Sequence, residues 1–185
     1  MRIIVLWEDQ LDVDVRNFGP GTLLAACVAD RLRCQMTQVA PLLKSIPRKG
    51  NGGIRKTLRS DFVQLEKSGP VFVVLDRDKM KDLWRNTHPH VNDCMTGHRQ
   101  RLQAEAPGDY DVVFLHQNME SLIQAACDAG RILAPTAKPT PSERDKYLNR
   151  LVWHEGSEPR ARLCELSPSF DRLATRVAEK LRTYV

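Results

Sequence analysis

The sequence predicts an α/β protein with a mostly parallel sheet. Three short runs of apolar residues, rich in β-branched side chains, have the character of buried strands, and polar residues follow each one. The segments between them have helical spacing, and alternation of strands with helices is typical of βαβ units. The three strand candidates are residues 2–7, 71–75 and 111–116.

Helix signals occupy the stretches between these strands. Residues 23–32 are mostly apolar and are opened by the Gly-Pro-Gly-Thr of residues 19–22. A less clear pattern over residues 35–46 adds a further strand candidate. One amphipathic helix is predicted by apolar residues at i, i+4, i+8 and i+11, which are Ile54, Leu58, Phe62 and Leu65.

The last third of the chain has a different pattern. Residues 134–142 are rich in Pro and Thr and predict a linker or surface loop. Two helices are expected beyond it, over residues 142–151 and from about Ser169 onward. We therefore expect an α/β core over residues 1–133, with residues 134–185 forming a linker and C-terminal helices packed on it within a single domain. One face of the last helix carries Phe170, Leu173, Ala174, Val177, Leu181 and Tyr184.

Composition is that of an ordinary globular chain of 185 residues, 42% hydrophobic and 28% charged. The net charge of +5 permits a nucleic-acid partner without requiring one. No apolar run approaches the roughly 20 residues of a membrane span, and the first ten residues have no room for a signal peptide. The five cysteines are widely spaced, with no CxxC pair, so we expect reduced thiols and a cytoplasmic location.

Four carboxylates follow the predicted strands at the positions where ligands bind in parallel sheets. Glu8 follows the first strand, Asp76 and Asp78 follow the strand at 71–75, and Glu120 lies near the helix start after the strand at 111–116. Alternate residues of an extended chain share a face, so Asp76 and Asp78 would point the same way. Hard oxygen ligands in such a group suit Mg²⁺ or Mn²⁺. The structural alternative is that these acids are turn formers and helix caps.

A glycine-rich segment, residues 48–56, precedes a predicted helix. Backbone N–H groups at a helix start bind anions, and the segment adds four cations, although the Walker A spacing is absent. This pattern predicts a site for nucleic-acid phosphates, and the alternative is a flexible loop with solvated charges. The four cations are Arg48, Lys49, Arg55 and Lys56.

A group of histidines offers a second metal candidate. His88, His90, Cys94 and His98 contain donors suited to zinc, and the last two are one helical turn apart. The spacing matches no established zinc pattern, which favours a polar loop leading into a helix around residues 99–106. Beside the strand-end acids, His116 could shuttle protons, although strand-end histidines are more often structural.

Taken in order along the chain, these motifs resemble the Toprim domain of topoisomerases, bacterial primases and OLD nucleases. More narrowly, the chain is similar to a family of small bacterial Toprim-like proteins of unknown function, related to the RloB group. The motifs cover nearly the whole chain, and the ordered set is more specific than any one of them. They are residues 49–56, 74–78, 118–123 and 167–173, together with the glutamate after the first strand.

The resemblance implies a compact Toprim-like fold with Mg²⁺ held by Asp76 and Asp78. Glu8 would hold metal or act as general acid and base, and Glu120 matches the acidic residue that follows the next strand. It also implies phosphodiester chemistry on nucleic acid, and it suggests a role in antiphage defence beside an ATPase partner. An oligomer is compatible with this interpretation. The chain departs from the usual Gly-x-Thr-Glu after the first glutamate, because residues 9–11 are Asp-Gln-Leu, and Asp9 is the candidate replacement for the second acid.

Three functions follow from these observations. The first is a metal-dependent nuclease in which Glu8 moves protons. The second is a non-catalytic module that binds a partner ATPase or nucleic acid, which the departure at residues 9–11 favours. The third is a phosphatase of the haloacid-dehalogenase type with Asp76 as nucleophile, which would leave Glu8 without a role.

Overall fold

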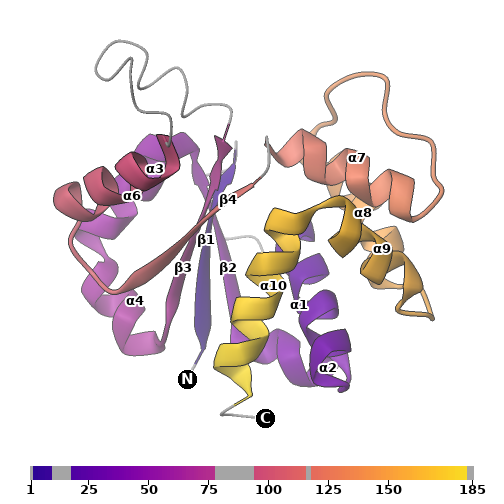
Figure 1. The fold of residues 1–185 in the computed structure, drawn as a ribbon, viewed down its shortest axis with the longest axis horizontal. Coiled ribbons are helices and arrows are strands. Elements are labelled where there is room, and N and C mark those ends of the chain that lie inside the picture. Colours follow the sequence, from indigo (N-terminus) through magenta and orange to yellow (C-terminus); the bar gives the residue numbers. More distant parts are fainter. Residues whose placement is uncertain (1, 10–17, 78–93, 116–117, 183–185) are drawn as a thin grey trace.

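The computed structural model describes residues 2–9, 18–77, 94–115 and 118–182, and its core is a four-stranded sheet (Figure 1). Neighbouring strands are all parallel, in the order β2-β1-β3-β4. This confirms the predicted α/β class. The strands are β1 (Ile3–Asp9), β2 (Leu43–Lys49), β3 (Val71–Asp76) and β4 (Tyr110–Leu115).

The central strands are covered on both faces, which explains why they appear in the sequence as continuous apolar runs. Every residue of β1 and β3 is buried. By contrast, β2 lies at the edge of the sheet and contains Pro47, a residue that edge strands tolerate. Its mixed sequence made it the least clear strand candidate, and the strand begins only at Leu43.

Helices form a layer on each side of the sheet (Figure 1). One face is covered by α3 (Gly50–Ser60), α4 (Phe62–Ser68) and α6 (Cys94–Glu105). The other is covered by α1 (Gly19–Leu32) and by α7 to α10. The latter are α7 (Met119–Ala129), α8 (Pro141–Val152), α9 (Glu158–Leu166) and α10 (Pro168–Leu181).

Strand alternation divides the apolar core into two clusters. Trp7 and the other odd residues of β1 pack with α1 and the C-terminal helices, whereas Leu6 and its even neighbour pack with α3, α4 and α6. The same alternation places Glu8 and Asp9, at the end of β1, on opposite faces of the sheet.

Three details differ from the predicted elements. The segment at 35–46 begins with the short helix α2 (Met36–Val39) and a 3-10 turn, η1 (Ala40–Leu42), before β2 starts. The predicted amphipathic helix is broken at Asp61 into α3 and α4, although its apolar stripe still faces one core. The sequence pattern did not indicate α9, which is short and mostly polar.

The C-terminal helices pack against the rest of the chain through apolar side chains. Leu148 of α8, Leu163 of α9 and Phe170 of α10 are fully buried in the same cluster as α1 and α7. The predicted α10 face is confirmed as far as Leu181, and Tyr184 lies outside the described residues.

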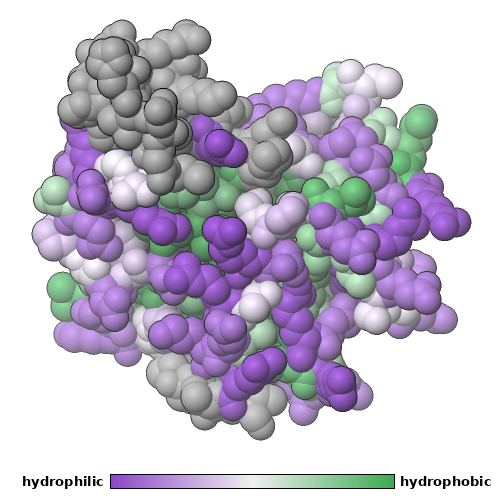
Figure 2. All heavy atoms as spheres, viewed as in Figure 1, coloured by the Kyte–Doolittle hydropathy of each residue, from purple (hydrophilic) through white to green (hydrophobic). Residues whose placement is uncertain are grey.

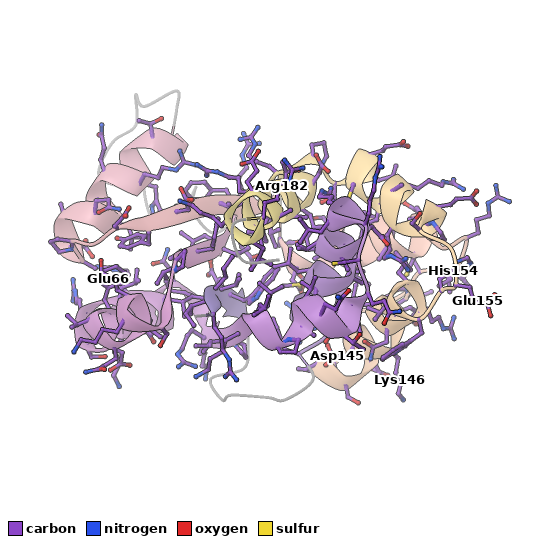
Figure 3. The ribbon with its side chains drawn as sticks, turned by 90° about the horizontal axis from the view of Figure 1, so that it is seen from below. Glu66, Asp145, Lys146, His154, Glu155 and Arg182 are labelled. Atoms are coloured by element: carbon purple, nitrogen blue, oxygen red, sulfur yellow. The ribbon has the colours of Figure 1, made fainter. Side chains whose placement is uncertain are left out.

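Charged side chains are spread over the whole surface that the structure describes. Side chains project from all sides in Figure 3, in which Glu66 of α4 and His154, after α8, mark opposite ends of the molecule. The face drawn in Figure 2 is mostly hydrophilic, and its apolar areas are small. None of the described helices combines the length and the apolar character needed to cross a membrane.

Candidate functional site at the carboxyl edge of the sheet

The strand order creates a site where the chain reverses direction across the sheet. The connection after β1 leads to β2 on one side, and β3 then pairs with β1 on its other side. Ligands of parallel α/β sheets bind beside such a switch point, at the carboxyl ends of the strands. Glu8 and Asp76 end the two strands that flank it.

A pocket of about 320 Å³ opens at this edge, and we call it the carboxylate pocket. It combines the ends of β1 and β3 with the start of α7, the start of α8 and the loop that precedes α8. Its walls are Glu8, Asp9, Asp76, Asn118, Met119, Glu120, Ile123, Lys138, Pro139, Pro141 and Arg144.

Glu8 and Asp76 are in direct contact. The backbone N–H of Asp76 donates a 3.0 Å hydrogen bond to Glu8 Oε2, and the two residues are only 2% and 4% exposed. Two buried acids of adjacent strands therefore share one wall of the pocket.

Asp9 forms a buried ion pair with a residue of α8. Arg144 of α8 donates from Nη1 to Asp9 Oδ2 at 2.5 Å, with side chains 6% and 1% exposed, and its guanidinium lies over the Phe18 ring. A buried ion pair of this kind ties α8 to the end of β1. Asp9, the candidate for the second acid, thus has a structural contact with α8 and also lies in the wall of the pocket.

Glu120 reaches the pocket from the first turn of α7. Asn118 caps this helix by accepting from the Ser121 N–H at 3.0 Å, and that cap fixes where the helix begins. Glu120 Oε1 pairs with Lys138 Nζ at 2.5 Å, and the lysine side chain is 60% exposed. The Pro- and Thr-rich segment is therefore more than a linker, because it brings a cation to the pocket.

Asp78 lies outside the described residues. Strand β3 ends at Asp76 and the backbone is already helical at Arg77, so the extended alternation used to align Asp76 with Asp78 stops at Asp76. Within the described ranges, no group of three or more His, Cys, Asp or Glu side chains is arranged to hold a metal ion. A metal at this edge would thus rest on Glu8 and Asp76, with Glu120 and Asp78 as the further acids nearby in the fold and in the sequence.

The glycine-rich segment lies at the same edge, because Arg48 and Lys49 are in register with Glu8 and Asp9. Its glycines form the first turn of α3 instead of a separate loop, and Gly50 has the positive φ of 60° that favours glycine. The predicted phosphate-binding cations divide into two pairs. Arg48 donates to Thr57 Oγ1 at 2.9 Å and Arg55 pairs with Glu105, whereas Lys49 and Lys56 are exposed.

Of the four residues in the histidine group, only His98 has a side chain that the structure describes. The side chains of the other three, His88, His90 and Cys94, lie outside the described part of the structure, and so does His116. His98 is buried, and its Nε2 lies 3.2 Å from Asn51 Nδ2 of α3. Burial, followed by the nearby positive charge of Arg55, lowers the pKa of His98 to about 4. A neutral His98 that accepts from Asn51 joins α6 to α3, which is a structural contact.

Sequence reasoning missed the two cations of the carboxylate pocket. Lys138 lies in a segment that carries a linker composition, and Arg144 has the spacing of any surface residue of a helix. Their partners are Glu120 and Asp9, which are 18 and 135 residues away in the chain. One signal was present, since Thr140 and Glu143 form a capping box that fixes the start of α8 and hence the placement of Arg144.

Comparisons with known protein families, with curated proteins and with solved structures gave no match to this chain.

Proposed function

We propose that the chain is a metal-dependent nuclease of the Toprim-like class, which cleaves phosphodiester bonds of nucleic acid with Mg²⁺ or Mn²⁺. The observation that carries the proposal is the convergence of Glu8, Asp76 and Glu120 on one pocket at the switch point of a parallel sheet. Strand-end acids acting as turn formers would have no reason to share a pocket.

The donor atoms of the pocket fit a hard divalent cation. Its acidic walls offer carboxylate oxygens, and the described residues that line it include neither cysteine nor histidine, so Mg²⁺ or Mn²⁺ suits it better than zinc. Glu8 and Asp76 would hold the ion, with Glu120 and, from its place in the sequence, Asp78 as further ligands. When bound, such an ion polarises a phosphate oxygen and lowers the pKa of its water.

Other tasks of the reaction, namely proton transfer, phosphate binding and support of the pocket wall, would fall to different residues of the chain. Glu8 is the candidate for moving a proton, because it lines the pocket beside the Asp76 backbone. Lys138 and the exposed Lys49 and Lys56 are candidates for contact with backbone phosphates. Asp9 and Arg144 hold the wall of the pocket in place.

This proposal extends to the cellular setting that the resemblance implied. A chain with these features would act in the cytoplasm, in antiphage defence, beside an ATPase partner that controls it. The net charge of +5 supports a polyanionic substrate.

Cleavage assays test the proposal directly. Plasmid DNA, single-stranded DNA and RNA are incubated with the purified chain and Mg²⁺ or Mn²⁺. We expect cleavage that falls at least about 100-fold in Asp76→Asn and in Glu8→Gln, because each removes a charged metal ligand. Asp111→Asn is the matched control, since Asp111 is a strand aspartate of β4 that pairs with Arg176 outside the pocket. Equal cleavage by the wild type and Asp76→Asn would contradict the assignment.

A non-catalytic binding module is the second candidate. The observation that favours it is the buried Asp9–Arg144 ion pair. In this pair Asp9, the candidate for the second catalytic acid, is already bound to an arginine. A pure protein that binds nucleic acid or an ATPase, yet neither Mg²⁺ nor Mn²⁺, would have this function.

A further inference from the structure

A pair of cysteines lies on the helical side of the molecule, on elements that contribute nothing to the carboxylate pocket. Cys27 of α1 and Cys164 of α9 are 137 residues apart in the chain, yet they lie close enough for each to affect the pKa of the other. Both are reduced, and both belong to the core cluster between α1 and the C-terminal helices.

Arg31 connects the two cysteines. Its Nη1 donates to the Cys27 backbone oxygen at 2.9 Å, and its Nη2 donates to Cys164 Sγ at 3.1 Å. The same guanidinium pairs with Asp171 of α10, which fixes its position. A cation that hydrogen-bonds a sulfur favours the thiolate over the thiol.

The two thiols are made unequal by these contacts. The hydrogen bond from Cys27 and then that from Arg31 lower the pKa of Cys164 to about 7, against the opposing effect of burial. The pKa of Cys27 is raised well above its usual range, first by the hydrogen bond with Cys164 and then by burial. Cys164 is therefore partly ionised near neutral pH, whereas Cys27 retains its proton.

Cys164 is reachable from solvent, although it is largely buried. It lines a second pocket of about 430 Å³ whose other walls include Arg31, Arg160 and Asp171. The further charged groups facing this pocket are Asp30 and Glu165, and Asp30 is paired with Arg160 at 2.6 Å. A small neutral oxidant can enter such an opening, whereas Cys27 behind it is 1% exposed.

We propose that Cys164 is a redox-modification site at which a hydroperoxide is reduced and a Cys27–Cys164 disulfide is formed. The Cys164 thiolate attacks one peroxide oxygen, the O–O bond breaks, and Cys164 becomes a sulfenic acid as hydroxide or alkoxide leaves. The Cys27 sulfur then attacks Cys164, the S–S bond forms, and the S–O bond breaks. The Cys27 proton leaves with the hydroxyl group as water, so two thiols supply the two electrons that the peroxide accepts.

The expected rate advantage is modest and measurable. A thiol of pKa about 7 is about half ionised at pH 7, against a few per cent for an ordinary thiol of pKa about 8.5. Lower basicity also reduces nucleophilicity, so the net gain at pH 7 is about threefold. The rate should rise through pH 7 and level off above it.

The test uses the full chain, reduced and then exposed to hydrogen peroxide. Samples are quenched with an alkylating reagent and mapped by mass spectrometry. Cys164 should react first, and a peptide pair linking Cys27 to Cys164 should accumulate, leaving three of the five thiols free to be alkylated. Cys127 is the buried comparison and Cys34 the more exposed one. The proposal is overturned if Cys164 reacts no faster than these two, or if it forms no bond with Cys27.

Single substitutions separate this chemistry from simple disturbance of the packing. In Cys27→Ser the sulfenic acid on Cys164 should persist and be trapped by dimedone, whereas Cys164→Ser should leave Cys27 reduced and Cys127→Ser should change nothing. Arg31→Gln should slow the reaction several-fold, but Asp171→Asn should not, because the negative charge of Asp171 raises the pKa of Cys164. Equal slowing in both variants would show a packing defect and overturn the role of Arg31.

Discussion

The carboxylate pocket and the glycine-rich segment lie at the same edge of the sheet, yet the fold uses their charged residues differently. At the ends of β1 and β3, Glu8 and Asp76 are buried and line a pocket. At the end of β2, Arg48 and Arg55 bond with Thr57 and Glu105, and the two lysines face solvent. Charge at a strand end thus indicates a site only when several strands bring it to one cavity.

The sharpest test of this contrast is a matched pair of substitutions. Arg144→Met and Arg55→Met each remove an arginine that is paired with a carboxylate, but only Arg144 and its partner Asp9 are fully buried. Leaving the Asp9 charge buried should cost about 3–5 kcal/mol in free energy of unfolding. The Arg55 pair is partly exposed, with side chains 36% and 22% exposed, and its loss should cost less than about 1 kcal/mol.

Urea denaturation of both variants measures this difference. Equal losses in the two variants would mean that burial does not distinguish the two regions.

The next effect concerns His98, which anchors the glycine-rich segment through Asn51. Because the pKa of His98 is about 4 in the folded protein and about 6.5 in the unfolded chain, the unfolded state binds more protons between these values. Stability should therefore be complete above pH 6.5 and fall as the pH drops toward 4. Between pH 7 and pH 5 this amounts to about 1 kcal/mol, after allowance for solvent that screens the ring.

In His98→Gln that contribution to the pH dependence should disappear. His154→Gln, at an exposed position, is the control for losing a histidine. The free energy of unfolding at the two pH values reports the result, and an unchanged difference in His98→Gln would show that another group causes the acid sensitivity.

A smaller effect is expected at the cation of the carboxylate pocket. Lys138 pairs with Glu120, so a divalent ion that needs Glu120 must compete with it. The pair is largely exposed and contributes about 0.2–1 kcal/mol, and Lys138→Met should raise Mn²⁺ affinity up to about fivefold. Lys146→Met, on the exposed surface of α8, should leave the affinity unchanged in the same titration. A weaker affinity in Lys138→Met would show that the lysine supports the site and does not compete for it.

The smallest effect on the fold is expected at Lys49 and Lys56. Both are exposed, so replacing either by alanine should change stability by less than about 0.5 kcal/mol. If they contact phosphates, each substitution should instead weaken nucleic-acid binding for all sequences and reduce the slope of log affinity against log salt by about 1. An unchanged slope would remove the glycine-rich segment from the binding surface.

The sequence predicted those parts of the fold that depend on local pattern. Apolar β-branched runs predicted the buried strands, and parallel pairing then placed Glu8 and Asp76 at one edge, as observed. Prediction from the sequence failed where a single residue or a partner distant in the chain determines the structure. The helix is broken at Asp61, although the apolar stripe is continuous in the sequence. The partners of Asp9 and Cys164 come from helices more than 130 residues away in the chain, and no local spacing indicates them.

Direct measurement of Mn²⁺ binding tests the central claim, that the strand-end carboxylates form a cation site. Calorimetric titration compares the wild type with Asp76→Asn and with the control Asp111→Asn. The account predicts binding by the wild type and the control, and at least tenfold weaker binding by Asp76→Asn. No binding by the wild type, or equal binding by all three proteins, would contradict it.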